Sequence, residues 1–348
     1  MTGYEAIREL PLTVAEERRE RAERDTSSGF TRVTTTIALS GADETGRGED
    51  VTYDAIDHER LASVGRVAPT GEYTFAEYSA ALDETELFPE EPEREASHHY
   101  RRWAYEAAAL DLALRQSETT LGAVIGRSPD PVRFVASTRL SVGDEEPTAD
   151  RVHALRARVP GIECKLDPTS DWTDELLAEL RATSAVVTLD LKGQYHGTMV
   201  DQEPDPALYE RVIEAFPEAV IEDPAVTAET RPMLEPIVDR LAWDAPITGI
   251  ESCEALPFEP RWLNVKPSRF GTVESLLATI AWANARDVSL YGGGQFESGV
   301  GRDQIQTLAA LFYPDGPNDV APGAYNEPTL PDELPASPLD PPEGEPGF

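Results

Sequence analysis

From Val132 onward the sequence alternates short apolar segments with amphipathic helical segments, and few folds accommodate this alternation. The apolar segments predict eight strands, at Arg133–Leu140, Gly161–Leu166, Ala185–Leu189, Ala219–Ile221, Leu241–Trp243, Trp262–Val265, Asp287–Tyr291 and Asn318–Ala321. Helices are predicted between most of them, for example at Trp172–Ala182, Pro206–Ala215, Val273–Ala285 and Arg302–Phe312. Eight strands within this span leave roughly 24 residues for each strand–helix unit, which is typical of a compact (β/α)8-type barrel.

The residues before this alternation predict a separate α+β unit. Phe30–Leu39 is rich in β-branched residues and predicts a strand, and Gly41–Gly48 is rich in Gly, Asp and Glu and predicts a turn. Arg101–Gln116 has the apolar periodicity of a helix. Seven prolines fall in the last 21 residues, so the end of the chain should be a wrapped or disordered tail. We therefore expect an α+β domain over residues 1–132, a barrel over 133–325 and a tail over 326–348.

The charge of the chain argues against some partners. It has 65 acidic and 30 basic residues and a formal net charge of −35. Nucleic acids and anionic membrane surfaces both require clusters of Lys and Arg, so neither is expected as a partner. Such a surface suits a salt-filled cytosol, as in a halophile, because salt near 1 M screens charge repulsion beyond roughly 3 Å.

Membrane insertion and secretion are not expected either. The sequence contains no run of 18 apolar residues that could span a bilayer, and the first ten residues lack the pattern of a signal peptide. Two cysteines, Cys164 and Cys253, do not make a disulfide framework. We therefore expect a cytoplasmic protein.

Acidic residues end three consecutive predicted strands. In a barrel of this type the chemistry lies at the C-terminal ends of the strands, where Asp190, Glu222 and Asp244 would converge. Three carboxylates at close range cannot all stay ionised without a cation. Ligands that offer only oxygen suit Mg²⁺, with Mn²⁺ as an alternative. The competing interpretation is that each acid caps the N-terminus of the next helix.

Only three of the basic residues are lysines: Lys165, Lys192 and Lys266. Lys165 and Lys266 end predicted strands two and six, which lie on opposite sides of an eight-stranded barrel. A substrate held by the metal would then have one ammonium group on each face. The competing interpretation is that these lysines only form salt bridges within the ring of acids.

These residues resemble the enolase superfamily, and within it the muconate-cycloisomerase-like branch of the mandelate racemase/muconate lactonizing enzymes. The resemblance covers about residues 30–325. Asp190, Glu222 and Asp244 fall at the positions of the three metal ligands of the family. Lys165 fits the second lysine of its K-x-K motif, and Lys266 fits its strand-six lysine. Three further segments are similar to family motifs: Gly46–Asp50 (GRGED) to the GxGE turn, Trp103–Ile125 to the helix and turn before the barrel, and Leu290–Gly301 (LYGGGQFESGVG) to the cycloisomerase segment LYGGTMLEGxxG.

The resemblance implies a modified TIM barrel, (β/α)7β, with an N-terminal α+β capping domain that reads a small carboxylate substrate. The reading segments would be Asp25–Thr31 and Val51–Asp54. It also implies Mg²⁺-dependent abstraction of the α-proton by a lysine, through a metal-stabilised enediolate. Such a base must be neutral near pH 7, and burial, a second cation and the metal should all lower its pKa. Asp319 would match the acid at the end of the last strand, unless it is only a turn residue. We also expect a homo-oligomer.

The chain departs from the family pattern in ways that keep several functions open. Glu163 replaces the first lysine of K-x-K, and the strand-five acidic segment is not recognisable, which makes Glu251 a rival to Asp244. Glu251 lies 15 residues before Lys266, too few for a helix, two loops and a strand, whereas Asp244 lies 22 residues before it. We therefore favour Asp244. Cycloisomerisation, dehydration of the o-succinylbenzoate-synthase kind and racemisation or epimerisation remain open, as does a non-catalytic protein that binds a metabolite or only assembles.

Lys192 lies two residues beyond Asp190, where the family has Asn. Residues two apart on a strand share a face, so Lys192 should point toward the same site as Asp190. We expect it to supply the missing cation, either by pairing with Glu163 or by reaching the substrate carboxylate. The competing interpretation is a surface lysine in the loop after strand three.

Overall fold

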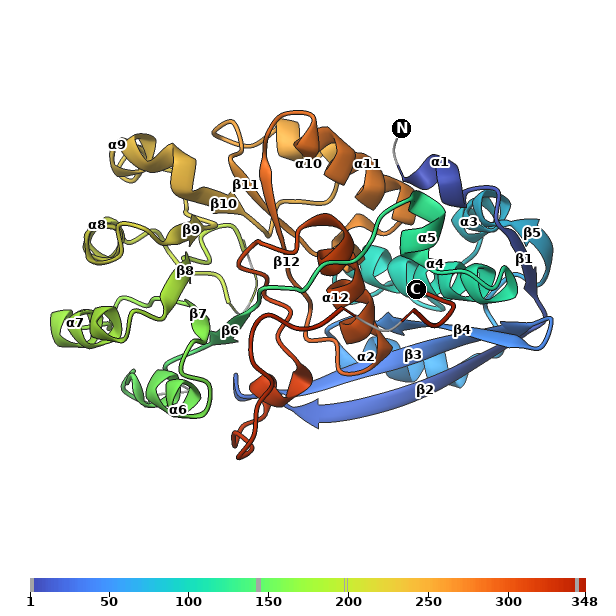
Figure 1. The fold of residues 1–348 in the computed structure, drawn as a ribbon, viewed down its shortest axis with the longest axis horizontal. Helices are drawn as coiled ribbons and strands as arrows, with labels where there is room; N and C mark the ends of the chain where they lie inside the picture. The colour runs from blue at the N-terminus through green and yellow to red at the C-terminus, as the bar shows by residue number, and fades with distance from the viewer. Residues whose placement is uncertain (1–2, 142–144, 197, 199, 342–343) are drawn as a thin grey trace.

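The computed structural model describes residues 3–141, 145–196, 198, 200–341 and 344–348. Its largest sheet has seven parallel strands in sequential order, and this sheet curls on itself (Figure 1). The strands are β6 Val135–Thr138, β7 Glu163–Leu166, β8 Val186–Asp190, β9 Val220–Glu222, β10 Leu241–Trp243, β11 Trp262–Val265 and β12 Ser289–Gly292. They correspond to the first seven predicted strands, so the predicted α/β barrel class is confirmed.

Helices connect these strands and cover the outer side of the curled sheet, where α6 to α9 are visible in Figure 1. They are α6 Asp150–Arg158, α7 Asp174–Thr183, α8 Pro206–Ala215, α9 Arg231–Leu234 with the 3₁₀ turn η1 Glu235–Arg240, α10 Ile250–Glu254, α11 Val273–Asn284 and α12 Val300–Phe312. Side-chain caps mark where some of these helices begin. The Thr173 hydroxyl accepts a hydrogen bond from Leu176 N–H at the start of α7, and Asp205 caps α8 in the same way, next to a proline in its first turn.

The predicted eighth strand, Asn318–Ala321, is not a strand. Instead, two isolated parallel bridges join Asn318 to Phe134 and Asp319 to Gly293, so the segment still links the two edges of the sheet. Pro317 and Pro322 bracket these four residues, and a proline has no N–H to donate to a ladder. The side chain of Asn318 replaces part of the ladder. Its amide nitrogen shares its two hydrogens among four backbone carbonyls, and its oxygen accepts from Gly292 N–H at 2.6 Å.

The N-terminal residues form the expected α+β unit. Its three-stranded antiparallel sheet pairs β2 Glu16–Asp25, β3 Thr31–Gly41 and β4 Glu44–Asp50. A two-stranded sheet pairs β1 Pro11–Val14 with β5 Gly71–Thr74. The helices are α1 Tyr4–Ile7, α2 Ala55–Ser63, α3 Phe75–Asp83, α4 Ser97–Gln116 and α5 Leu121–Ile125, and two further 3₁₀ turns, η2 Pro267–Phe270 and η3 Gly323–Asn326, lie in the C-terminal half.

The prediction of a turn over Gly41–Gly48 is wrong for most of that segment. The turn is confined to Ala42 and Asp43, which both have positive φ, of 48° and 63°. Such a two-residue connection matches the twist of a hairpin, so the following residues continue directly as strand β4.

The glycines of β4 let this strand lie directly on helix α4. A Cβ at Gly46 or Gly48 would overlap backbone atoms of α4, among them the carbonyl oxygens of Ala108 and Ala104. Ala104 and Ala108 are four residues apart and therefore share one face of the helix. The GRGED segment is thus a strand that needs glycine for a close backbone contact, and not a turn.

Glu49, between these glycines and Asp50, links the capping domain to the barrel. Its carboxylate accepts hydrogen bonds from the backbone N–H groups of Ser298 (2.8 Å), Gly299 (3.0 Å) and Gly301 (2.9 Å). These groups form the N-terminus of α12, where unpaired N–H donors and the helix dipole favour an anion. Two of the motifs that carried the family resemblance therefore contact each other.

The described residues of the C-terminal tail contact both parts of the chain, and residues 342 and 343 lie outside the described range. Phe134 N–H, next to the first barrel strand, donates to Ser337 Oγ at 2.9 Å. Leu339 pairs with Val132 in an antiparallel bridge. The ring of Phe348 packs edge-on against Trp103 of α4, with centroids 6.3 Å apart. Among the described residues, no helix combines the length and apolarity needed to cross a membrane.

We predict that Gly48→Ala destabilises the protein by about 1 to 3 kcal/mol, because the added methyl group collides with the backbone of α4. Gly65→Ala is the matched control in the same domain, since nothing lies within 4 Å of a Cβ there. Urea unfolding followed by circular dichroism measures both. Equal stability of the two variants would contradict the close contact of β4 with α4.

The buried ion pair of Asp50 and Arg101 generates a second prediction. Burial alone would raise the pKa of Asp50, but Arg101 at 2.8 Å and the hydrogen bonds from Thr52 lower it to about 2. Because the folded pKa lies below the unfolded value of about 3.9, ionised Asp50 stabilises the fold above pH 4, and this contribution is lost as the pH falls toward 2.

Asp50→Asn should therefore cost about 3 to 5 kcal/mol of unfolding free energy at pH 7, and the difference from the native chain should shrink between about pH 4 and pH 2. Asp54→Asn is the control, because Asp54 pairs with the partly exposed Arg94 and should cost less than about 1 kcal/mol. Urea unfolding at a series of pH values tests both. A loss at Asp50 that is no larger than at Asp54, or that does not depend on pH, would count against the buried pair.

Candidate active site

A cavity of about 500 Å³ lies where the C-terminal ends of the barrel strands meet the capping domain. Both segments expected to read the substrate contribute to its wall, with Phe30 from one and Tyr53 from the other. Lys165, Lys192 and Lys266 line the same cavity, so every lysine of the chain faces one site.

The three predicted metal ligands meet beneath this cavity. Asp190 ends β8, Glu222 ends β9 and Asp244 follows β10, and Asp190 is the register partner of Glu222. All three are fully buried, and each offers a carboxylate oxygen within 4.8 Å of the others. The rival residue Glu251 lies exposed on α10 and is not part of this group.

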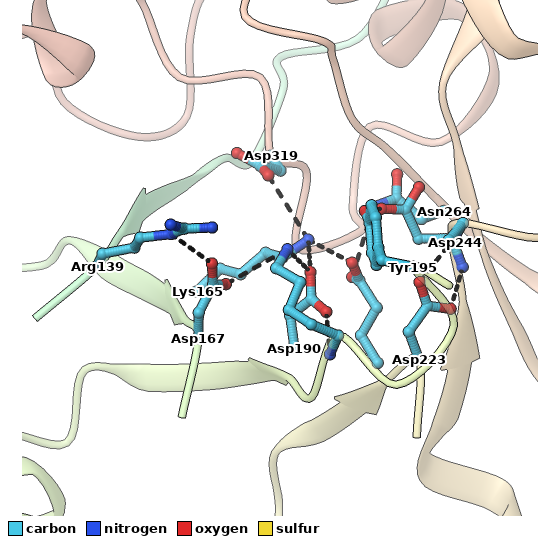
Figure 2. Close-up of polar contacts among 12 residues, drawn as sticks. Arg139, Lys165, Asp167, Asp190, Tyr195, Asp223, Asp244, Asn264 and Asp319 are labelled. Atoms are coloured by element: carbon cyan, nitrogen blue, oxygen red, sulfur yellow. Dashed lines mark hydrogen bonds and ion pairs between the residues drawn. The ribbon is translucent and has the colours of Figure 1, made fainter. Parts of the chain in front are cut away.

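The three lysines pair with these three carboxylates, and Figure 2 shows Lys165 beside Asp190 and Asp319. Lys165 Nζ lies 2.5 Å from Glu222 Oε1 and 3.3 Å from Asp190 Oδ2, and Lys266 Nζ lies 2.7 Å from Asp244 Oδ2. Lys192 Nζ also contacts Asp190 Oδ2. Lys165 is on β7 and Lys266 follows β11, four strands along the sheet, so their ammonium groups reach the carboxylates from different sides.

Lys192 reaches the site, but not in the company of Glu163. Glu163 accepts two hydrogen bonds from Arg133, at 2.7 and 2.9 Å, at the opposite end of strand β7 from the cavity. Lys192 instead lies between Asp190 and Asp167, whose Oδ1 is 3.6 Å from its Nζ. Of the two alternatives for Lys192, pairing with Glu163 is therefore wrong. Glu163 lies two residues before Lys165 on β7, which places it about 7 Å farther from the site. Lys192 has a φ of +55°, a conformation that costs energy for a non-glycine residue and is often found at functional sites.

Asp319 lies at the edge of the cavity on the segment that closes the barrel. Its Oδ2 is 3.6 Å from Lys165 Nζ, and its side chain is 21% exposed. It is thus a neighbour of the lysine and not only a turn residue.

The carboxylates shift the pKa values of the groups around them. Burial raises the pKa of Glu222 well above its usual range, and Asp190 and Asp244 add to this rise despite Lys165. Burial would lower the pKa of Lys165, but Glu222, Asp190 and Asp319 together raise it well above its usual range. In this arrangement three close carboxylates outweigh burial. The expected lowering of the lysine pKa depends also on the charge of a bound metal ion and stays a prediction.

Several polar residues at the site were not predicted from the sequence. Tyr195 OH donates to Asp244 Oδ2 at 2.7 Å, and Arg269 Nη2 donates to Tyr195 OH at 3.2 Å. Tyr291 OH donates to Glu222 Oε2. Tyr195 and Arg269 lie in segments that follow β8 and β11, so only their closeness in sequence to a predicted ligand or lysine could have indicated them.

The glycine run after β12 lets the backbone lie against the strand-six lysine. A Cβ at Gly293 would lie 2.5 Å from Asn264 Oδ1 and 2.8 Å from Lys266 Cε. Any larger residue at Gly293 would displace the lysine side chain or the amide.

The three carboxylates fit a hard divalent cation such as Mg²⁺. They offer oxygen ligands on adjacent rigid strands, which suits this ion. Asp244 Oδ1 is buried and accepts no hydrogen bond within the described part of the chain, although Arg269 Nη1 lies 3.5 Å away. A buried carboxylate oxygen without a donor is costly unless a cation binds it.

Two family models match almost the whole chain: the N-terminal domain of "Domain of unknown function (DUF8230)" over residues 5–124 and its C-terminal domain over residues 128–327. The chain belongs to the DUF8230 family. No curated protein matches it significantly.

Solved structures with the same architecture come from the enolase superfamily. Muconate cycloisomerase from Pseudomonas fluorescens is 18% identical, with a TM-score of 0.64, and the match covers 88% of this chain and 87% of that one. An enolase-superfamily member from Listeria innocua Clip11262 is 17% identical, with a TM-score of 0.63 and coverage of 90% and 86%. Dipeptide epimerase from Methylococcus capsulatus, complexed with Mg and the dipeptide L-Arg-D-Lys, is 18% identical, with a TM-score of 0.63 and coverage of 90% and 92%. The predicted enolase-superfamily fold, a modified barrel with a capping domain, is confirmed.

We predict that Asp244→Asn weakens binding of Mg²⁺ or Mn²⁺ by at least about tenfold, because it removes an anionic oxygen ligand without changing side-chain shape. Glu251→Gln, which also removes one carboxylate, should bind the ion like the native protein. Isothermal titration calorimetry with Mg²⁺ and electron paramagnetic resonance with Mn²⁺ measure this directly. Loss of binding in Glu251→Gln with normal binding in Asp244→Asn would show that the ligand after strand β10 is wrongly assigned.

Proposed function

We propose that the protein is a Mg²⁺-dependent lyase or isomerase that removes the α-proton of a small carboxylate substrate. The observation that carries the proposal is the placement of Lys165 and Lys266 in one cavity above three buried carboxylates. This arrangement offers a cation site and two proton-transfer groups that approach from different sides.

Asp190, Glu222 and Asp244 would hold the metal ion. The ion supplies positive charge next to the substrate carboxylate, where negative charge develops when the α-proton leaves. Lys192 would bind the same carboxylate, since its Nζ lies at the cavity wall beside Asp190.

Lys165 and Lys266 would exchange the proton with the α-carbon. In a racemase or epimerase, one lysine takes the proton from one face and the other returns a proton to the opposite face. In a cycloisomerase or dehydratase, one lysine transfers the proton and the other stabilises charge. Asp319 would orient Lys165 through the contact at 3.6 Å. The names of the similar structures include a cycloisomerase and an epimerase, so the proposal covers both kinds of reaction.

Lys165→Ala and Lys266→Ala should each reduce α-proton exchange by a factor of about 10² to 10⁴, because each variant lacks a positioned acid–base group. Exchange is measured by proton NMR in D₂O with Mg²⁺ and a library of small carboxylates. Glu163→Gln is the control on the same strand as Lys165, since its carboxylate binds Arg133 and not the site. It should exchange protons at the native rate.

Two outcomes would contradict the proposal. Exchange at the native rate in both lysine variants would remove the lysines from the reaction. Mg²⁺ binding without exchange on any carboxylate would favour a protein that binds a metabolite without transforming it.

A further inference from the structure

Part of the cavity wall is aromatic. Phe30 comes from the turn between β2 and β3 of the capping domain, and Phe296 follows the glycine run after β12 of the barrel. Both side chains line the cavity and are half-buried. Their rings meet edge to face, with centroids 5.1 Å apart and planes at 80°. We call Phe30 and Phe296 the aromatic clamp.

The backbone of Phe296 is held in an unfavourable conformation. Its φ is +58°, in the left-handed region, which costs a bulky residue roughly 1–2 kcal/mol. The neighbours hold it there. Gln295 N–H donates to the carboxylate of Glu297 at 2.9 Å, and the Gln295 side chain lies 2.7 Å from Tyr53 OH. Strained residues that are held by their surroundings cluster at functional sites, so we infer that the position of the Phe296 ring serves binding.

Phe30 is fixed as firmly on the other side. Thr26 donates to Phe30 O through both its N–H, at 3.0 Å, and its hydroxyl, at 2.9 Å. Gly29 supplies the positive φ of 79° that this turn requires. Ser27 N–H donates to the carbonyl of Asn326, at 2.7 Å, so the turn is attached to the C-terminal half of the chain. The clamp is therefore preorganised by contacts from both domains.

We infer that the aromatic clamp binds a flat aromatic group of the substrate, whose carboxylate lies toward the lysines. This inference rests on the proposed function and names its substrate class. Two half-exposed aromatic rings would gain by burial under a ligand ring, and aromatic pairs gain further from edge-to-face or offset stacking. A strongly polar group at the same place would lose hydrogen bonds to water, because the two phenyl rings offer it no partner.

Three carboxylates with an α-CH₂ or α-CH₃ group test the clamp: phenylacetate, cyclohexylacetate and acetate. Isothermal titration calorimetry with saturating Mg²⁺ should show phenylacetate binding about ten- to thirtyfold more tightly than acetate, with cyclohexylacetate between them. Phe30→Leu and Phe296→Leu should each bring phenylacetate to the level of cyclohexylacetate and leave acetate unchanged. Leu keeps an apolar group of similar size, so the fold should survive, and circular dichroism verifies this.

Phe258→Leu is the matched control. This phenylalanine lies outside the cavity, with Arg231 stacked 4.8 Å from its ring, and the variant should keep the full preference for phenylacetate. Phenylacetate binding no more tightly than acetate, or an unchanged preference in both clamp variants, would overturn the inference.

The same three compounds separate this inference from the proposed function, because proton exchange at their α-carbon is measurable by NMR in D₂O. A clamp-dependent preference without exchange would support the clamp and contradict α-proton abstraction for these ligands. Exchange without any preference for phenylacetate would support the proposed function and overturn the clamp.

Discussion

Three carboxylates buried at one point of the barrel mouth set the requirement that the rest of the site meets. Charge this deep must be neutralised, and this chain does so with its lysines and, at Asp244, also with Arg269. Lys165, Lys192 and Lys266 are its only lysines, and each pairs with one of the three acids. This arginine-rich protein thus has lysine, with its compact ammonium group, where space is tight. At Gly293, for example, a Cβ would lie 2.8 Å from Lys266 Cε.

The capping domain lies over the barrel mouth, and the carboxylate of Glu49 attaches it to the N-terminus of helix α12. Glu49 accepts hydrogen bonds from the first N–H groups of α12, and Gly301 allows that approach, because a Cβ there would lie 2.9 Å from Glu49 Oε2. The segment that Glu49 binds begins two residues after Phe296. The same contact therefore attaches the domain and fixes the barrel side of the aromatic clamp.

The fold could be predicted where the alternation of apolar and polar side chains determines the secondary structure. It was harder to predict where single contacts of one residue determine it. Apolar alternation located seven strands, and their ends located Asp190, Glu222 and Asp244, because parallel strands end at one edge. Strand β2 was hidden, since its sequence EERRERAERD is almost wholly charged and mostly exposed. Asn318 closes the barrel with its side chain, which no strand pattern reveals. The two-residue period of a strand predicted which face of the sheet Glu163 lies on, but not how far along β7 it lies from the cavity. Its pairing with Arg133 was therefore missed.

The overall charge gives a reason why the proposed aromatic clamp would matter for a carboxylate substrate. A chain with a net charge of −35 repels a carboxylate at long range when salt is low, and salt that screens this repulsion also weakens attraction by partly exposed cations. The buried lysines would attract such a ligand only at short range, since most of their charge is already balanced by carboxylates. Burial of apolar surface is not weakened by salt and is strengthened by some salts. In the proposed function, Phe30 and Phe296 would therefore provide binding free energy that does not depend on the charge of the protein, and the lysines and carboxylates would determine which atom reacts.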